Sequence, residues 1–216
     1  MIHIYPALMG ANYNEYKKLD QLDGLVDRVH IDIMDGAFVS YKTTGADELN
    51  NYIKKTKFLL WIHAMVEFPE CFYQELVLPQ GTLFSFHLES NGDFLNLIKL
   101  IKEKKHRASI ALNPKTPISE AIPFLGIVDQ VLVMSVDPGA SGQPFLKEVI
   151  KKIEDFVLYR QQHDLAFRIA VDGGVNKENI SLLAQMGVDD CAISSGIFNQ
   201  KDPGQALRAL HRLVED

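Results

Sequence analysis

The stretch between residues 28 and 36 places an imidazole and a carboxylate two residues apart in an apolar run, at His30 and Asp32. Successive side chains of a strand point to opposite faces, so His30, Asp32 and Met34 share one face, and Ile31 and Ile33 share the other. A charged carboxylate is costly to bury in a strand unless another group pairs with it. A divalent metal ion or a proton-transfer reaction would supply the reason for such a pair.

Two further polar residues stand at the ends of apolar runs, His63 and Asp172. Together with His30 and Asp32 they provide two imidazoles and two carboxylates, a set that suits Zn²⁺, Fe²⁺, Mn²⁺ or Co²⁺. Taken singly, a strand histidine is usually a hydrogen-bonded core residue, and a strand-end aspartate usually caps a loop. The occurrence of all four at strand ends favours one shared metal site.

Strand-like runs alternate with helix-like segments along the chain, which predicts βαβ units and a parallel sheet. The predicted strands are Ile2–Leu8, Arg28–Met34, Lys57–Met65, Thr82–Leu88, Arg107–Leu112, Gln130–Val136, Phe167–Val171 and Asp189–Ser194. Helices are predicted at Asp93–Lys104, at Lys147–Tyr159, from Asn176 to Gly187 and at Gln205–Val214, and Thr116 with Pro117 is typical of another helix start. Eight units favour an α/β fold, a (β/α)₈ TIM barrel forming one domain over residues 1–216. An open doubly wound sheet is the alternative.

A barrel of this kind gathers its active site at the C-terminal ends of its strands. Met34, Met65 and Met134 stand at such ends and would form a soft apolar floor, although core filling fits their positions equally well. The fourth strand ends in His87 and Glu89, which lie outside the proposed metal set.

Small residues punctuate the loops after the sixth, seventh and eighth strands. The candidate substrate-binding positions there are Gly139, Ala140, Ser141, Gly142, Gly173, Gly174, Ser194 and Ser195. Glycine permits tight turns and close approach to a ligand, and barrels often bind phosphate after strands seven and eight through backbone N–H groups.

The composition is that of an ordinary globular protein, with 47% hydrophobic and 23% charged residues among 216. A formal charge of −6 argues against a nucleic-acid surface, and no apolar run reaches the length of a membrane span. Cys71 and Cys191 show no metal-type spacing, and the first residues lack the pattern of a secretion signal. We therefore expect reduced thiols, a cytoplasmic location, and no nucleic-acid or membrane partner.

Several motifs, in their order along the chain, resemble the ribulose-phosphate 3-epimerase family nearly from end to end. They are Pro6 with Leu8, residues 30–36, Phe38-Val39, residues 63–66, His87-Leu88-Glu89, Asn113-Pro114, Thr116-Pro117, residues 131–134, Asp137-Pro138-Gly139, Gly142-Gln143, residues 171–175 and Ile197-Phe198. The resemblance implies a metal-dependent isomerase of the pentose phosphate pathway that interconverts ribulose 5-phosphate and xylulose 5-phosphate. It further implies a ketose phosphate substrate and a homo-oligomer.

By the same resemblance, Asp32 and Asp172 are the acid/base pair of an enediolate mechanism. Both would also bind one divalent metal ion together with His30 and His63, and His63 would contact the substrate. One carboxylate would stand on each side of the planar intermediate, and the metal would stabilise its oxygens.

The chain departs from the family pattern at several substrate-binding positions and at none of the four metal-set residues. The departures are Ala7, Ala37, Ser40, Tyr41, Ala140, Ser141 and Ser194. They leave open an allulose-6-phosphate 3-epimerase, and a degenerate barrel that binds a phosphorylated ligand without catalysis. Related decarboxylases and hexulose-phosphate synthases carry Asp-x-Lys-x-x-Asp, whereas the sequence Asp32-Ile33-Met34-Asp35 contains no lysine, so those activities are disfavoured.

Overall fold

The computed structural model describes residues 2–11, 13–140 and 142–215. Eight parallel strands form a closed barrel in chain order, and the last strand pairs with the first. They are β1 (His3–Met9), β2 (Arg28–Met34), β3 (Leu59–Met65), β4 (Leu83–His87), β5 (Arg107–Leu112), β6 (Gln130–Met134), β7 (Arg168–Asp172) and β8 (Asp190–Ile193). The predicted (β/α)₈ barrel is confirmed, and the open doubly wound sheet is wrong.

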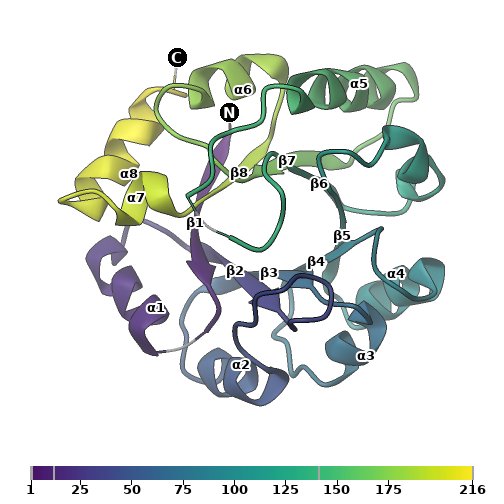
Figure 1. Ribbon diagram of the computed structural model, residues 1–216, viewed down its shortest axis with the longest axis horizontal. Helices are drawn as coiled ribbons and strands as arrows, with labels where there is room; N and C mark the ends of the chain where they lie inside the picture. The colour runs from purple at the N-terminus through teal and green to yellow at the C-terminus, as the bar shows by residue number, and fades with distance from the viewer. Residues whose placement is uncertain (1, 12, 141, 216) are drawn as a thin grey trace.

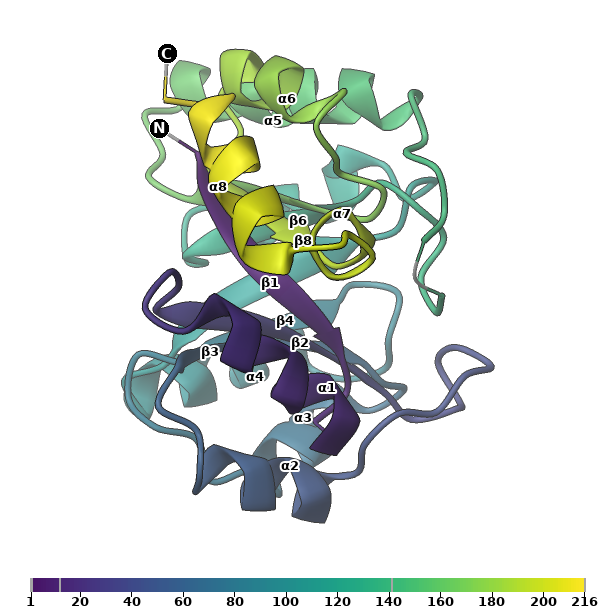
Figure 2. The ribbon, with the colours of Figure 1, turned by 90° about the vertical axis from the view of Figure 1, so that its left-hand side faces the viewer.

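Helices surround this ring, as the view along the barrel in Figure 1 and the side view in Figure 2 show. The α-helices are α1 (Tyr13–Lys17), α2 (Ala46–Ile53), α3 (Pro69–Gln74), α4 (Phe94–Glu103), α5 (Val149–Gln162), α6 (Ile180–Met186), α7 (Ser195–Phe198) and α8 (Pro203–Arg212). Short 3₁₀ helices are η1 (Lys18–Leu22), η2 (Ile118–Glu120) and η3 (Ile122–Phe124). Within the described ranges, no helix combines the length and the apolar character that crossing a membrane requires.

The core has two layers, because each strand is buried on both of its faces. Outward-facing side chains such as Ile31 and Ile33 are at most 1% exposed and pack beneath the helices. A smaller cluster that includes Trp61, Leu132 and Ala170 fills the barrel interior. The strand alternation expected from the sequence therefore directs His30 and Asp32 into the barrel.

The segment after Thr116 differs from the prediction of a regular helix. Two short 3₁₀ helices, η2 and η3, stand there instead, and Pro117 rather than Thr116 occupies the position before η2. The Thr116 hydroxyl donates a hydrogen bond to Glu89, a tertiary partner, so it is not available to cap a helix. The predicted stop at Gly187 is confirmed, since Gly187 ends α6 with a φ of 92°.

Candidate metal centre and active site

Four side chains converge near the C-terminal mouth of the barrel. His30 and Asp32 come from β2, His63 from β3 and Asp172 from the end of β7. One potential ligand atom of each lies within 4.8 Å of the others. The paired register of β2 and β3 sets Asp32 beside His63, which is the local reason that the two side chains meet.

Each imidazole of this group faces both carboxylates. His63 Nδ1 lies 2.9 Å from Asp32 Oδ1 and 3.4 Å from Asp172 Oδ2. His30 Nε2 lies 3.0 Å from Asp32 Oδ1 and 3.7 Å from Asp172 Oδ2. Two nitrogens and two carboxylates therefore point to one small region, a donor set that can hold a divalent metal ion.

Burial intensifies the electrostatics of the group. Both histidines are fully buried, and Asp32 is 8% exposed. Burial alone would raise the pKa of Asp32, but His30 and His63 outweigh it and hold that pKa below its usual range. Burial alone would lower the pKa of His63, but Asp172 and Asp32 outweigh it and raise that pKa to about 9. The carboxylates thus attract a positive charge, which a proton or a metal ion supplies.

Most of the candidate substrate-binding residues line one pocket above this group. The predicted residues that line it are Asp32, Asp172, Met34, Met65, Met134, Gly139, Ala140, Gly142, Gly173, Gly174, Ser194 and Ser195. Ser141 lies outside the described residues. His63 is fully buried and is not part of this lining, and its contact with substrate stays a prediction.

The segment between β6 and α5 passes across the mouth of the barrel in Figure 1. Gln143 Nε2 donates to the backbone oxygens of Asp137 at 2.7 Å and Ala140 at 3.0 Å. Gly174 has a φ of 62°, and a Cβ there would come within 2.5 Å of the Phe145 nitrogen. Close approach between the β7 loop and this segment therefore requires glycine.

Two residues left outside the predicted metal set prove to be connected to it. His63 Nε2 lies 2.9 Å from His87 Nε2, and His87 Nδ1 lies 3.1 Å from Glu89 Oε2. Burial lowers the pKa of His87 and so favours its neutral form. The available signal was the His-x-carboxylate spacing of His87 and Glu89, which repeats that of His30 and Asp32.

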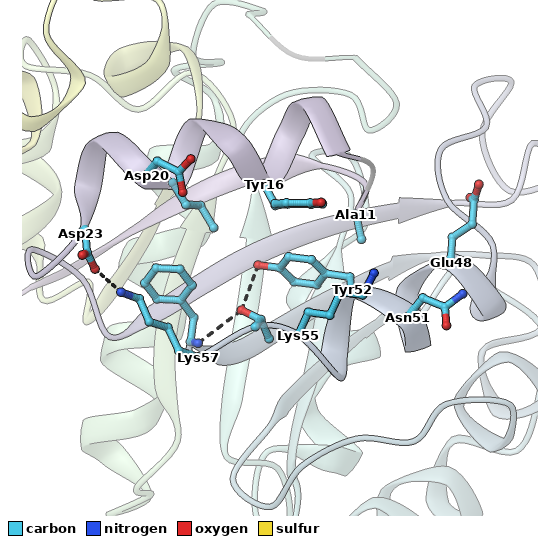
Figure 3. A pocket seen from close by; sticks show the side chains of 12 residues that line it. Ala11, Tyr16, Asp20, Asp23, Glu48, Asn51, Tyr52, Lys55 and Lys57 are labelled. Carbon is cyan, nitrogen blue, oxygen red and sulfur yellow. Dashed lines mark hydrogen bonds and ion pairs between the residues drawn. The ribbon is translucent and has the colours of Figure 1, made fainter.

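A larger cavity, of about 670 Å³, lies outside the barrel between α1, η1 and α2 (Figure 3). Tyr16 and Tyr52 face each other there with ring centroids 5.5 Å apart, and Lys57 pairs with Asp23. None of the predicted site residues lines this cavity. The candidate active site is therefore the smaller pocket at the mouth, where the titratable groups gather.

Comparison with known proteins gives the same family as the motifs. The model of the "Ribulose-phosphate 3 epimerase family" matches residues 3–198. The cytoplasmic isoform of ribulose-phosphate 3-epimerase from Oryza sativa subsp. japonica is 34% identical over 98% of this chain and 94% of its own length. The ribulose-phosphate 3-epimerase of Aquifex aeolicus is 33% identical over 88% of this chain and 86% of its own length.

Among solved structures, 3-hexulose-6-phosphate synthase from Salmonella typhimurium matches with a TM-score of 0.68 at 14% identity, covering 99% of this chain and 98% of the synthase. Identity this low supports the fold alone. The closed barrel carries two carboxylates and two histidines at its mouth, a donor set that can hold a metal ion, as in a barrel enzyme. The chain belongs to the ribulose-phosphate 3-epimerase family.

Proposed function

We propose that the protein is a metal-dependent 3-epimerase that interconverts ribulose 5-phosphate and xylulose 5-phosphate. The observation that carries the proposal is the convergence of Asp32 and Asp172, which line the mouth pocket, with the buried His30 and His63. A binding module would not need two acidic groups flanking one position. Family membership supports the same reaction, since the curated relatives are named for it.

Epimerisation at C3 requires a base on one face of the sugar and an acid on the other. One carboxylate of the Asp32 and Asp172 pair begins ionised and takes the C3 proton. The C–H electron pair forms the C2–C3 double bond, and the π pair of the C2 carbonyl moves onto its oxygen; when C3 is protonated again, the oxygen pair re-forms the carbonyl and the C2–C3 π pair forms the new C–H bond. The second carboxyl begins protonated and returns a proton to the opposite face of C3. The two aspartates arise from β2 and β7 and both line the pocket, as this two-sided transfer demands.

His30, Asp32, His63 and Asp172 would hold one divalent cation, of which Zn²⁺, Fe²⁺, Mn²⁺ and Co²⁺ all suit the donor set. When bound, the cation supplies Lewis-acid stabilisation for the negative charge that develops on the substrate oxygens. Met34, Met65 and Met134 surround the same space with apolar surface and keep bulk water away from the proton transfer.

The phosphate of the substrate would bind among the loops that follow β7 and β8. Gly173, Gly174, Ser194 and Ser195 line that end of the pocket, and the short helix α7 begins at Ser195. A barrel commonly binds phosphate at this place through backbone N–H groups and the start of a short extra helix. The arrangement needs no lysine, and the described lining contains none.

The pocket as it stands encloses only about 50 Å³ of free space. Pockets that bind small molecules usually measure about 300–1,000 Å³. The residues of the β6–α5 segment, including Pro138 and Gln143, form part of the lining, so this segment must move aside to admit a sugar phosphate.

The test is turnover of ribulose 5-phosphate in D₂O, with and without a chelator. We expect xylulose 5-phosphate carrying deuterium at C3, and loss of turnover when the metal is removed. No turnover of any ketose phosphate by the metal-loaded protein would overturn the proposal and favour a barrel that only binds its ligand. Equal assays with allulose 6-phosphate would show which sugar phosphate is preferred. The cytoplasmic location, the homo-oligomer and the single domain over residues 1–216 stay predictions.

A further inference from the structure

A chain of hydrogen bonds runs outward from the candidate metal centre through the fourth strand. His63 presents Nδ1 to Asp32 and Asp172, and its other ring nitrogen, Nε2, lies 2.9 Å from His87 Nε2. His87 Nδ1 then lies 3.1 Å from Glu89 Oε2. His63 and His87 are both fully buried, and their rings stack with centroids 5.1 Å apart.

The direction of the protons in this chain follows from the metal site. A metal ligand must offer a lone pair, so His63 Nδ1 carries no proton when a cation is bound, and the proton sits on Nε2. That N–H can donate only if His87 Nε2 offers a lone pair. The proton of neutral His87 must then sit on Nδ1, where it donates to the Glu89 carboxylate.

The outer end of the chain is fixed by two groups that donate to Glu89, of which the Asn113 backbone N–H can act only as a donor. Glu89 Oε1 accepts the backbone N–H of Asn113 at 2.7 Å and the hydroxyl of Thr116. Lys152 donates to the backbone oxygens of Asn113 at 2.6 Å and Pro114 at 2.7 Å, which anchors the loop that carries these donors. Glu89 therefore turns its second oxygen, Oε2, toward His87.

The geometry points to His87 and Glu89 as positioning residues that set the tautomer of His63 and so make its Nδ1 a metal ligand. The inference rests on the metal site of the proposed function, and it adds two residues that act through His63 rather than touching the cation or the substrate. Partners of this kind commonly tune metal affinity by about 10- to 100-fold.

Glu89→Gln is the sharpest variant because it changes one acceptor into a donor at nearly constant size. Asn113 and Thr116 hold the amide oxygen at the Oε1 position, so the amide NH₂ faces His87 Nδ1. His87 must then carry its proton on Nε2, which faces His63 Nε2 and drives the His63 proton onto Nδ1. His63 then carries its proton on Nδ1, the nitrogen that should bind the metal ion.

Glu67→Gln provides the matched control. Glu67 also follows a barrel strand, but among the described residues its side chain accepts only a long contact of 3.4 Å, from Asn91 at the surface. The control removes the same negative charge without touching the hydrogen-bond chain. Any effect shared by both variants is therefore a general effect of charge.

The experiment measures Zn²⁺ affinity by competition with a chromophoric chelator in the full-length chain, in both variants. We expect Glu89→Gln to weaken Zn²⁺ binding by about 10- to 100-fold, and Glu67→Gln to leave it unchanged. Equal Zn²⁺ affinity in Glu89→Gln and the unaltered protein would overturn the inference. Urea unfolding of the metal-free variants shows whether each is folded.

A second measurement needs no variant, and it tests the inferred tautomer of His63 even if Glu89→Gln does not fold. Long-range ¹H–¹⁵N NMR of the Zn²⁺-loaded protein reports which ring nitrogen of each histidine is protonated. We expect the proton on Nε2 of His63 and on Nδ1 of His87, and a proton on Nε2 of His87 would contradict the inference. Neither measurement uses a sugar phosphate, so an inactive protein that shows these tautomers would contradict the proposed epimerase alone.

Discussion

The two ends of the barrel both bury acidic side chains, but they neutralise them in different ways. At the N-terminal end, Asp190 accepts two hydrogen bonds from Arg168, at 2.8 and 2.6 Å, and one from Gln130 at 2.8 Å. Gln130 in turn accepts from Ser109 at 2.9 Å. Arg168 and Gln130 are partners of fixed charge and fixed polarity, and the His3 imidazole also lies 3.6 Å from Asp190.

At the mouth, Asp32 and Asp172 share two imidazoles whose charge depends on pH or on a bound ion. His30 Nδ1 is buried without a hydrogen-bond partner among the described residues. No lysine or arginine is paired with either carboxylate in the described part of the chain. The positive charge at the mouth therefore comes either from protonation of its histidines or from a bound metal ion.

Trp61 keeps the two ends apart. It is fully buried in the barrel interior, donates to Ser85 at 2.7 Å, and packs edge-on against His30 with ring centroids 4.4 Å apart. Asp190, which is paired for stability, and Asp32 and Asp172, which are proposed for catalysis, therefore lie at opposite ends of the barrel. This separation is expected for the fold. Three experiments test this contrast between the two ends of the barrel.

The largest expected effect comes from Asp172→Asn. The amide can neither take nor return a proton, so we expect turnover of ribulose 5-phosphate to fall by about 10²- to 10⁴-fold, the usual worth of a general acid or base. At a pH above about 9, where His63 has lost its extra proton, the free energy of unfolding of the metal-free protein should change by less than about 1 kcal/mol, because the partners of Asp172 among the described residues are the His30 and His63 imidazoles. Steady-state kinetics and urea unfolding measure the two quantities. Retained turnover would remove Asp172 from the acid/base pair.

Asp190→Asn should give the opposite pattern. It leaves the Arg168 guanidinium facing an amide in a partly buried site, and we expect the free energy of unfolding to fall by about 2–3 kcal/mol. Turnover per folded molecule should be retained, since Trp61 separates Asp190 from the mouth. Urea unfolding measures the free energy of unfolding. Steady-state kinetics, divided by the number of sites counted by Zn²⁺ titration, measure the turnover per folded molecule. A loss of turnover in the folded variant would show that the two ends are coupled.

Much of the architecture could be predicted from the sequence, for reasons visible in particular residues. The spacing of His30 and Asp32 places both on one strand face, and parallel strands bring their C-terminal ends together, so His63 and Asp172 could be grouped with them. The closed ring followed from eight alternating units. These inferences need only the period of the strands and the order of the elements.

The hydrogen-bond chain from His63 to Glu89 could not be predicted in the same way. It depends on the register that sets His63 beside Ser85 and on side-chain torsions that turn His87 back toward His63. Thr116 shows the same limit, because its local pattern is typical of a helix cap while its hydroxyl is bonded to Glu89 instead. Tertiary contacts override local preference at such positions.

The third experiment follows the pH dependence of stability that His63 contributes at the mouth. In the metal-free protein the pKa of His63 is raised from 6.5 to about 9, and the folded state therefore binds this proton more tightly than the unfolded state. Stability from protonated His63 is fully present below the unfolded pKa and is lost as the pH rises through the folded pKa. We expect the free energy of unfolding in chelator to fall by at most about 3 kcal/mol across that window.

Urea unfolding at a series of pH values, with chelator present, measures this slope. His63→Asn should flatten it, whereas Asp190→Asn should keep it, because the guanidinium of Arg168, the partner of Asp190, stays charged across this window and His63 does not. Saturating Zn²⁺ should reverse the trend, since a metal ion competes with the His63 proton and binds more tightly as the pH rises. An equal slope in His63→Asn and in the unaltered protein would place the titrating group elsewhere and would remove the electrostatic distinction between the two ends.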